Sequence, residues 1–475
     1  MDDRYSKLIL PITLLGCCLL AIYASIFRPG YLSSAQYLGG LIFLEIMAAA
    51  IWNYRRSFFV LLMAVFLWAG VALPLRETWA SGRWFVLLAG ALVGFVIYMR
   101  DRGHHFGAFH LVAFSCVLAA LVSALVTAYP EQAVLKALSL LLLFLYAASG
   151  ARLAVMGREA QFFNGLLLGC ETLIYLSAIS YFIFRFEIFG NPNSLGAVMG
   201  VVTMPVLLWG VIISEAGTQR RRTFALLVSL LLLLSSYARA GIAGGAMGCF
   251  LLCVALRQYR LLIKGVGLAL LSAVLVISLA PNRETQTDSL TLRFVYKGHR
   301  DAGVLDSRLS VWQRTSASIQ EHPWFGTGFG TSDTRLTESN DHSLGYRSAA
   351  VATREHGNSY LAITEWVGLL GVLPFLALVI LVSFYVIRAV GWMRRTGNAH
   401  APAVPIAAIL AAGLVHAAFE DWLFAVGYYL CVFFWSMAFV LVDVVPKTAP
   451  SLAVSSAPQP VGGWTNSVGV VLPQR

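Results

Sequence analysis

Long apolar runs constrain this chain more than any other feature of its sequence. Several runs reach roughly 20 residues with almost no charge, which is the length that an α-helix needs to cross a bilayer. Hydrophobic residues make up 59% of the 475 residues and charged residues only 12%, whereas soluble domains carry about 25% charge. The runs and the composition together predict an all-α polytopic membrane protein, with the lipid bilayer as its surroundings.

The runs alternate with charged gaps and predict about fourteen (12–14) transmembrane helices. The expected spans are 8–27, 36–54, 57–73, 84–99, 108–128, 133–150, 162–184, 194–214, 223–238, 240–256, 265–280, 359–387, 402–419 and 427–444. The first run could be mistaken for a signal peptide. It lacks a small-residue cleavage site and another span follows at once, so we interpret it as a retained helix.

The net charge of +11 suggests nucleic acid at first, but the distribution of basic residues gives another explanation. Arginine clusters fall in alternate gaps, and the intervening gaps hold single basic residues. The clusters include Arg55 and Arg56, Arg100 and Arg102, Arg152 and Arg158, Arg220 to Arg222, and Arg394 and Arg395. This is the positive-inside bias of membrane proteins. We therefore expect no nucleic-acid partner, and the even number of spans places both termini in the cytoplasm.

One polar segment, residues 281–358, breaks the alternation and is predicted to lie outside the membrane. A loop of this length usually carries function. Within it, "SRLSVWQRTSASIQEHPWFG" places Leu309, Trp312, Ser316 and Ile319 at helical spacing, which predicts an amphipathic helix on the outer membrane surface. The glycines of the following "GTGFG" are interpreted as a turn that closes this helix.

The chain therefore divides into five parts. They are N-terminal transmembrane helices at 1–160, further helices at 161–280, the outer loop at 281–358, C-terminal helices at 359–445 and a disordered cytoplasmic tail at 446–475.

The stretch "REHGNSYLAITEWVGLLG" places a histidine, His356, where the outer loop meets the next apolar run. Asn358 or Ser359 is expected to cap the helix that follows. Since histidine changes charge near neutral pH, His356 could remove a proton from a sugar hydroxyl as that hydroxyl attacks. The alternative is a solvated loop histidine.

The stretch "RFEIFGNPNSLG" contains an arginine, Arg185, followed by residues that are typical of a turn. Asn191 and Asn193 flank a proline, and Asn193 or Ser194 is expected to cap the next helix. The N–H groups of an outward-facing helix N-terminus can seat a phosphate, and Arg185 could add a positive charge. The alternative is an ordinary capped turn with an arginine that reaches toward the lipid headgroups.

The stretch "SSYARAG" places Arg239 within an otherwise apolar region. A guanidinium near hydrocarbon costs about 2.5–3.5 kcal/mol, so it should lie near the interface with a partner. Arginine also matches phosphate geometry with two parallel hydrogen bonds. The alternative is a short loop whose arginine reaches the headgroups.

Several other polar residues lie within the predicted spans. Glu45, Glu171 and Glu365 are functional candidates because ionisable groups in membranes usually are. Glu365 follows His356 by nine residues, and a helical projection places the two side chains on opposite faces, so no dyad is expected. His416 and Glu420 could pair. The seven cysteines lie in predicted spans and imply no disulfide framework or metal site.

The ordered stretches "GNPNSLG", "SYARAG", "RLSVWQRTSASIQEHPWFGTGFG" and "HGNSYLAITEWVGLLG" resemble the O-antigen ligase and polymerase (WaaL/Wzy-type) superfamily. The resemblance covers about 185 to 390. It implies a GT-C-like glycosyltransferase of the bacterial inner membrane that joins glycans on the periplasmic side. The implied donor is an undecaprenyl-diphosphate-linked glycan, the acceptor is lipid A–core or another glycan, and no metal, nucleotide or other cofactor is needed.

The same resemblance implies roles for individual residues. His356 becomes the base, and Arg239 and Arg185 hold the diphosphate. Substrate contacts are expected from the turn, from the loop helix and from the start of the following span, namely Asn191, Asn193, Ser194, Arg308, Trp312 and Asn358. Whether the chain is a ligase or a polymerase stays open. The rival class is a polyprenyl-glycan flippase or other secondary transporter, which would need ionisable groups at mid-membrane and inverted repeats; the sequence offers the former but no clear repeat.

Overall fold

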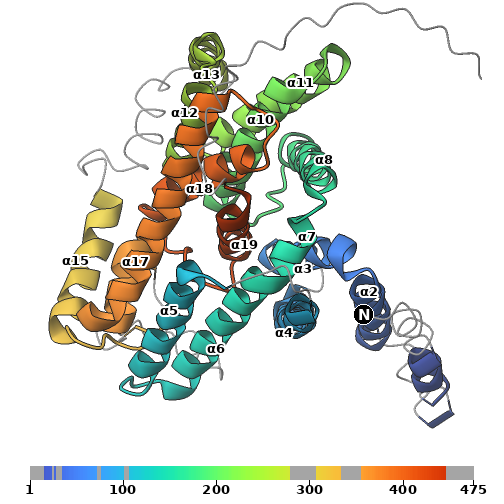
Figure 1. Ribbon diagram of the computed structural model, residues 1–475, viewed down its shortest axis with the longest axis vertical. Helices are drawn as coiled ribbons and strands as arrows, with labels where there is room; N and C mark the ends of the chain where they lie inside the picture. The colour runs from blue at the N-terminus through green and yellow to red at the C-terminus, as the bar shows by residue number, and fades with distance from the viewer. Residues whose placement is uncertain are drawn as a thin grey trace, which may run out of the picture. The chain divides into compact units, whose positions relative to one another are not determined.

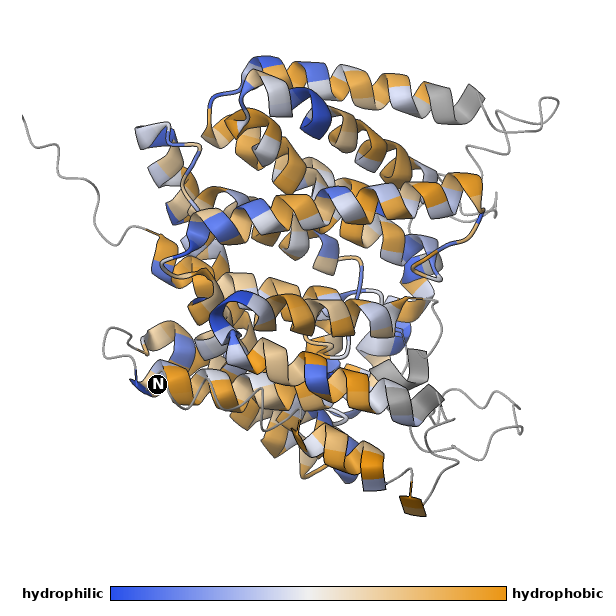
Figure 2. Cartoon of the chain, turned by 90° about the vertical axis from the view of Figure 1, so that its right-hand side faces the viewer, coloured by the Kyte–Doolittle hydropathy of each residue, from blue (hydrophilic) through white to orange (hydrophobic). Residues whose placement is uncertain are grey.

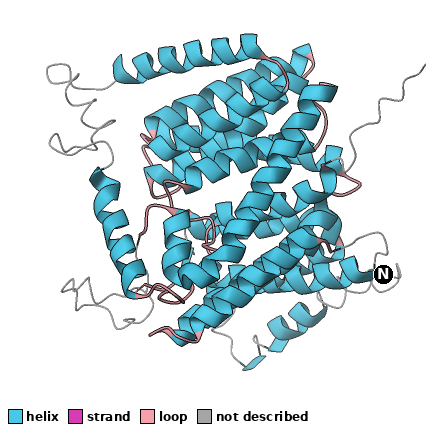
Figure 3. Ribbon diagram, turned by 60° about the vertical axis from the view of Figure 1, so that its left-hand side comes forward, coloured by secondary structure: helices cyan, strands magenta, loops and turns pink. Residues whose placement is uncertain are grey.

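The computed structural model describes residues 15–23, 26–27, 35–71, 76–100, 106–278, 306–332 and 355–445. Within these ranges every regular element is a helix, as the cyan ribbons of Figure 3 show. Residues Met1–Val445 make up one unit. The tail expected at 446–475, much of the span expected at 8–27 and most of the outer loop fall outside the described residues.

The helices follow one another in the order shown in Figure 1. The first half contains α2 (Ala35–Trp52), α3 (Tyr54–Gly70), α4 (Arg76–Arg100), α5 (Ala108–Ala124), α6 (Pro130–Tyr146), η2 (Ala147–Ala151), α7 (Arg152–Val155), α8 (Glu159–Ala178) and η3 (Ile179–Ile183). The second half contains α9 (Pro192–Val198), η4 (Met199–Thr203), α10 (Met204–Ile213), α11 (Ala216–Ser235), α12 (Arg239–Ala255), α13 (Tyr259–Ser278), α15 (Asp306–Glu321), α17 (Ser359–Thr396), α18 (Ala403–Ala417) and α19 (Tyr429–Val444).

The helices are apolar enough for a bilayer. Five of those described are long and hydrophobic enough to cross it, at Ala80–Arg100, Pro130–Val155, Glu159–Ile183, Pro192–Ile213 and Ser359–Thr396. Shorter apolar helices accompany them, and Figure 2 shows hydrophobic colours along most of the helices. The prediction of a helical membrane protein is therefore confirmed, whereas fourteen spans and a GT-C-like arrangement stay predictions.

Glycines bring α9, η4 and α12 into close contact. A Cβ atom added at Gly200 would lie 2.0 Å from the carbonyl oxygen of Gly241, and one added at Gly196 would lie 2.2 Å from the Cβ of Ala238. Small residues allow helix backbones to approach in this way. Because Gly196 of α9 contacts Ala238 at the N-cap of α12, the N-termini of α9 and α12 lie side by side.

Helix α18 runs antiparallel to α12. A Cβ added at Gly244, near the start of α12, would lie 2.9 Å from the carbonyl oxygen of Ala412, and one at Gly248 would lie 3.0 Å from that of Ala408. The C-terminal end of α18 therefore reaches the same end of the bundle as the N-termini of α9 and α12. We call this the His356 end, because the α18–α19 loop (residues 418–428) there contacts His356.

Helix α17 is broken at Gly368, where φ is 68° and ψ is −178°. The backbone of the preceding loop, residues 322–332, enters the break. The N–H groups of Thr327 and Gly328 donate to the carbonyls of Glu365 and Trp366 at 2.9 and 3.0 Å. In return, the N–H of Leu369 donates to Pro323 O at 2.7 Å. Broken helices within membranes are tolerated where other protein groups satisfy the freed backbone, and this loop does so.

The glycines of the "GTGFG" stretch therefore do more than close a helix. Gly326 has a φ of +72°, and a Cβ there would lie 2.4 Å from the carbonyl oxygen of Glu365. The loop is also tied to the helices beneath it, because the hydroxyl of Thr127 donates to Thr327 O at 2.6 Å and the Lys136 ammonium donates to Gly330 O. The loop thereby becomes part of the helical bundle.

Two charged groups that the sequence suggested for other roles form ion pairs inside the bundle. Arg152, expected in a cytoplasmic gap, is 3% exposed and binds both carboxylate oxygens of Asp443 on α19. Glu171, a functional candidate, lies 3.1 Å from the guanidinium of Arg221. A charge near hydrocarbon is stabilised by a partner of opposite sign, so both residues stabilise helix packing.

Candidate active site

His356 precedes α17, in a turn that ends at the helix cap. Asn358 is the N-cap, and its side-chain oxygen accepts hydrogen bonds from the N–H groups of Tyr360 at 2.8 Å and Leu361 at 3.1 Å. The prediction of Asn358 as a cap is confirmed. Gly357 has a φ of +62°, which turns the chain back just before the helix begins.

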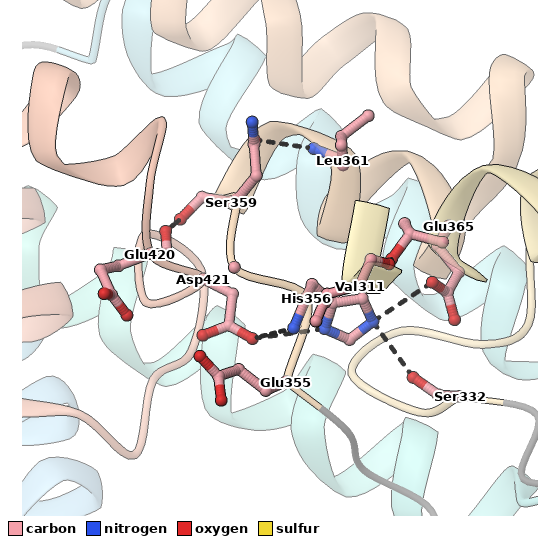
Figure 4. A network of polar contacts seen from close by, with 12 residues as sticks. Val311, Ser332, Glu355, His356, Ser359, Leu361, Glu365, Glu420 and Asp421 are labelled. Atoms are coloured by element: carbon pink, nitrogen blue, oxygen red, sulfur yellow. Dashed lines mark hydrogen bonds and ion pairs between the residues drawn. The ribbon is translucent and has the colours of Figure 1, made fainter. Parts of the chain in front are cut away.

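The imidazole of His356 lies between two carboxylates (Figure 4). Its Nδ1 is 3.3 Å from Oδ2 of Asp421, which also accepts the backbone N–H of His356 at 2.8 Å. Its Nε2 is 3.3 Å from Oε2 of Glu365 and 3.2 Å from the hydroxyl of Ser332. His356 is 1% exposed, so it is not the solvated loop residue that was the alternative.

The expectation that His356 and Glu365 cannot pair is wrong. The helical projection behind it counted 100° for each residue from His356 onward, but α17 begins only at Ser359. The positive φ at Gly357 folds the imidazole over the first turns of the helix, where Glu365 lies. Periodicity therefore fails at this site because the residues between the two partners are not all helical.

The carboxylates set the charge of the histidine. Burial alone would lower the pKa of His356, but hydrogen bonds and charge from Asp421 and Glu365 raise it above its ordinary value. Burial would raise the pKa of Asp421, but its hydrogen bonds from His356 lower it below the ordinary range. Each partner favours the charged form of the other, and an imidazole held in this way is a stronger base once it is neutral.

Helix α15 lies against the start of α17 and contributes two predicted residues (Figure 1). Arg308 donates to Oε1 of Glu355 at 2.8 Å and to Oε1 of Glu420 at 2.5 Å. The indole N–H of Trp312 donates to the carbonyl of Gly357 at 3.3 Å. Trp312 thereby holds the backbone next to His356, and Arg308 joins Glu355 to the α18–α19 loop.

The buried face of α15 differs from the one that its apolar spacing predicted. Leu309 is 42% exposed and Ser316 is also exposed, whereas Thr315 and Ser318 are buried against the bundle. The hydroxyl of Thr315 donates back to the helix carbonyl of Val311 at 3.0 Å. Small polar residues let α15 approach α17 closely, and the apolar Leu309 faces outward.

The sequence pattern did not predict that the α18–α19 loop contributes to this candidate site. The loop contributes Asp421 and the Glu420 backbone carbonyl, which accepts the hydroxyl of Ser359 at 2.6 Å. Ser359 in turn accepts the N–H of Leu423 at 3.1 Å. The available signal was the acidic pair of "FEDW", placed directly after an apolar span on the same predicted side as His356.

His416 and Glu420 do not form the pair that their spacing suggested. Nδ1 of His416 accepts the indole N–H of Trp422 at 2.7 Å, and Glu420 binds Arg308. Helix α18 ends at Ala417, before Glu420, so the two residues do not share one helical face. His416 therefore has a structural role, as a hydrogen-bond acceptor for Trp422.

The second group of predicted residues surrounds the start of α9. Asn191 is the N-cap, and its side-chain oxygen accepts the N–H of Asn193 at 2.8 Å. The expected cap at Asn193 or Ser194 is wrong because Pro192 occupies the first helical position, where a proline fits without loss. Ser194 lies instead within the first turn and hydrogen bonds with Tyr428, at the end of the α18–α19 loop.

Arg239 is the first residue of α12 and is partly buried. The chain enters this helix through Tyr237, whose φ of 51° is uncommon for a residue with a side chain. The hydroxyl of Ser236 supports the turn by accepting the N–H of Ala238 at 3.3 Å. Because Ala238 packs on Gly196, Arg239 lies beside the turn that contains Asn191 and Ser194.

The structure thus gathers the predicted residues into two groups at the His356 end. His356, Asn358, Arg308 and Trp312 form one group, and Asn191, Asn193, Ser194 and Arg239 form the other. The α18–α19 loop contacts both. Arg185 has a φ of 51° and is exposed in the segment between η3 and α9, away from the contacts that define either group.

A comparison with known families finds one match. The family described as O-antigen ligase matches residues 224–376, a range that contains Arg239, Arg308 and His356 and ends before Asp421. No match to a curated protein is found. The matched range holds the motif stretches from α12 to the start of α17, in the order on which the resemblance rested. Residues 224–376 of the chain are therefore similar to the O-antigen ligase family.

Proposed function

We propose that this protein transfers a glycan from undecaprenyl diphosphate to an acceptor hydroxyl at the periplasmic face of the bacterial inner membrane. The similarity of residues 224–376 to the O-antigen ligase family supports glycan transfer with lipid-linked substrates in a membrane. The observation that carries the mechanism is the imidazole of His356, held between Asp421 and Glu365. Lipid A–core and a second lipid-linked glycan both fit as acceptors.

In the proposed reaction, His356 acts as the general base. Asp421 accepts the Nδ1–H of the neutral imidazole, which leaves the Nε2 lone pair free on the side of Ser332. The acceptor hydroxyl gives its proton to Nε2 while its oxygen attacks the anomeric carbon. The bond between that carbon and the phosphate oxygen breaks, and the diphosphate leaves with the electron pair. Attack opposite the leaving group inverts the anomeric configuration.

The two carboxylates have separate tasks in this scheme. Asp421 selects the tautomer of His356 and orients its ring, as a carboxylate does in a catalytic triad. Glu365 lies near the nitrogen that receives the proton and stabilises the imidazolium as it forms. Positioned proton transfer of this kind contributes roughly 10²- to 10⁴-fold to rate.

The leaving diphosphate is assigned to the second group of residues. The N-termini of α9 and α12 lie side by side, and helix N-termini attract phosphate through free N–H groups and the helix dipole. Arg239 stands at the start of α12, where its guanidinium can neutralise charge that grows on the leaving oxygen. Arg185 would reach the same headgroup from the exposed turn before α9.

Two findings weaken the transporter hypothesis. Glu171, one of the ionisable groups on which it rested, is paired with Arg221. Glu365, another, is paired with His356. A carboxylate that moves with a transported ion needs freedom to exchange partners, and both of these groups are held by neighbouring helices or turns.

The test is transfer by the purified protein in vesicles that contain an undecaprenyl-diphosphate glycan and a hydroxyl acceptor. His356→Ala should lower the transfer rate roughly 10²- to 10⁴-fold, while His400→Ala, which removes an exposed histidine, should leave it unchanged. Transfer by His356→Ala within a few-fold of wild type would disprove the base assignment. Movement of the glycan lipid across the bilayer without new glycosidic bonds would instead favour the transporter.

The arginine assignment has its own test. Arg239→Lys keeps the charge but loses the two parallel hydrogen bonds that a guanidinium makes with phosphate. Both Arg239→Lys and Arg239→Ala should therefore lower transfer, with Arg394→Lys on the opposite end of α17 as the matched control. Full activity of Arg239→Lys would show that charge alone is needed.

A further inference from the structure

A groove of about 430 Å³ lies between α3 and α8. Its floor is formed by η4 and by the first turns of α19. Its apolar lining includes Phe59, Met63, Leu67, Leu166, Leu173 and Phe433. One end reaches Tyr429, at the His356 end of the bundle, and the other end reaches Arg55, Arg56 and Arg158.

Two glycines keep the groove open. Gly165 and Gly169 are four residues apart on α8, so they share one helical face. Both line the groove, and a Cβ atom added at either would meet nothing within 4 Å. The space in front of α8 is therefore not filled by neighbouring side chains of the described residues. Two helices bridge the groove at one point, where the ring of Phe59 lies 5.1 Å from that of Phe162.

The other end of the groove is strongly basic. Arg55 and Arg56 are exposed at the start of α3, and Arg158 precedes α8. The guanidinium of Arg158 donates to the backbone carbonyl of Arg55 at 2.7 Å, which brings the cations together. Burial, followed by the positive charges of Arg56 and Arg55, lowers the pKa of Arg158. Like charges gathered in this way favour an anionic partner.

This basic end lies at the opposite end of the bundle from His356. Helix α3 runs from Arg55 to Gly70, and a Cβ at Gly70 would lie 2.8 Å from the ring of Tyr429, at the start of α19. Helix α8 likewise begins beside Arg158 and continues through η3 toward the turn at Asn191. A ligand held by these arginines therefore has its charged group at the other membrane face from the donor diphosphate of the proposed function.

We propose that the groove binds an anionic phospholipid, with its phosphate against Arg55, Arg56 and Arg158 and an acyl chain along α8. A soluble anion would use the arginines but not the apolar lining. A zwitterionic lipid would use the lining but gain less from the arginines. A polyprenyl diphosphate held by Arg239 has its charge at the wrong end. The bound lipid fills the seam between α3 and α8 and so links the N-terminal helices to the rest of the bundle.

The experiment measures lipid retention by native mass spectrometry of the detergent-purified chain, with dioleoylphosphatidylglycerol and dioleoylphosphatidylcholine as probes. The wild type should prefer the anionic lipid. Each arginine near a lipid headgroup strengthens binding roughly five-fold, so the variant Arg55→Gln/Arg56→Gln/Arg158→Gln should lose that preference. Arg394→Gln/Arg395→Gln, which removes an exposed pair at the last turn of α17, should keep it.

A second variant tests the groove itself. Gly165→Leu/Gly169→Leu adds side chains where there is open space, so it should block the acyl chain without lowering the thermal unfolding midpoint of the lipid-free protein. Retention of the anionic lipid should fall in this variant. Equal retention of both lipids by the wild type, undiminished preference in the arginine variant, or undiminished retention in the glycine variant would overturn the proposal. So would displacement of the anionic lipid by undecaprenyl phosphate, which would assign the groove to the donor tail.

Discussion

Replacement of Asp421 by asparagine separates the positioning role of this residue from the role of His356 itself. The substitution keeps the size of the side chain and removes its negative charge. In the structure, Oδ2 of Asp421 accepts both the backbone N–H of His356 at 2.8 Å and the ring Nδ1 at 3.3 Å. An amide can accept one of these bonds, but it no longer fixes the tautomer or stabilises an imidazolium.

Two effects on transfer are expected from Asp421→Asn. The maximal rate should fall, by up to about 10⁴-fold where the wrong tautomer results. The pH profile should also move. Since burial lowers the pKa of His356 and Asp421 opposes it, the pKa should drop when the carboxylate is lost.

The direction of the pH shift follows from the base mechanism. His356 must be neutral to accept a proton, so activity falls as pH drops through its pKa, and the acidic limb of the wild type should lie above the ordinary value of 6.5. In Asp421→Asn this limb should move to lower pH while the maximum decreases. The assay is the initial rate of glycan transfer in vesicles between about pH 5 and 9, where histidine titrates.

Glu355→Gln is the matched control for this experiment. Glu355 precedes His356 in sequence, but its side chain is 64% exposed and binds Arg308 rather than the imidazole. The acidic limb of the pH profile of Glu355→Gln should coincide with that of the wild type. If Asp421→Asn lowers the rate but leaves the limb in place, the carboxylate does not act on the charge of His356 and the reasoning is refuted.

Three further predictions concern stability. Because the pKa of His356 is raised and that of Asp421 lowered in the folded state, their pair should stabilise the protein between those two values. The free energy of unfolding should then decrease as pH rises through the pKa of His356 or falls through that of Asp421. In denaturant titrations, His356→Gln should flatten the decrease on the alkaline side. An unaltered dependence of the unfolding free energy on pH in this variant would exclude the pair as its cause. Gly368→Ala should destabilise the protein by about 1–3 kcal/mol or more, because φ is +68° and the new Cβ would lie 2.4 Å from the carbonyl carbon of Trp324. Gly391→Ala, with open space around it, should not lower the unfolding midpoint. Equal midpoints for both variants would contradict the role of the break in α17. Arg152→Gln should lower the unfolding midpoint, since it leaves the partly buried carboxylate of Asp443 without its charged partner. Arg394→Gln on an exposed turn should cost little. Chemical unfolding in detergent compares the two, and similar midpoints would show that the pair with Asp443 is not needed.

Several features of this molecule could be predicted because they depend on neighbouring residues. Apolar length and low charge are enough to predict membrane helices, and the helices at Pro130–Val155 and Ser359–Thr396 agree with that reasoning. The helix at Asp306–Glu321 follows from spacing within one turn. The cap at Asn358 follows from the preference of asparagine for this position.

Other features depend on contacts between distant parts of the chain. His356 and Asp421 are 65 residues apart, and the loop that supplies Asp421 has no repeating pattern. Local spacing also predicts the wrong position for Glu365, because the chain turns at Gly357 before the helix begins. Local spacing does not predict the break in α17 either, because the freed backbone groups of the helix are hydrogen bonded by the distant residues 322–332.

The amino-acid sequence by itself therefore determined the helical membrane class and the loop helix, and it indicated His356 as the candidate base. Those properties arise from periodicity and transfer energies that act over one or two helical turns. The tertiary structure decided which carboxylates surround the imidazole, which helix ends meet beside Arg239 and where the apolar groove opens. These depend on how helices pack, and packing brings together side chains whose spacing in the sequence carries no common pattern.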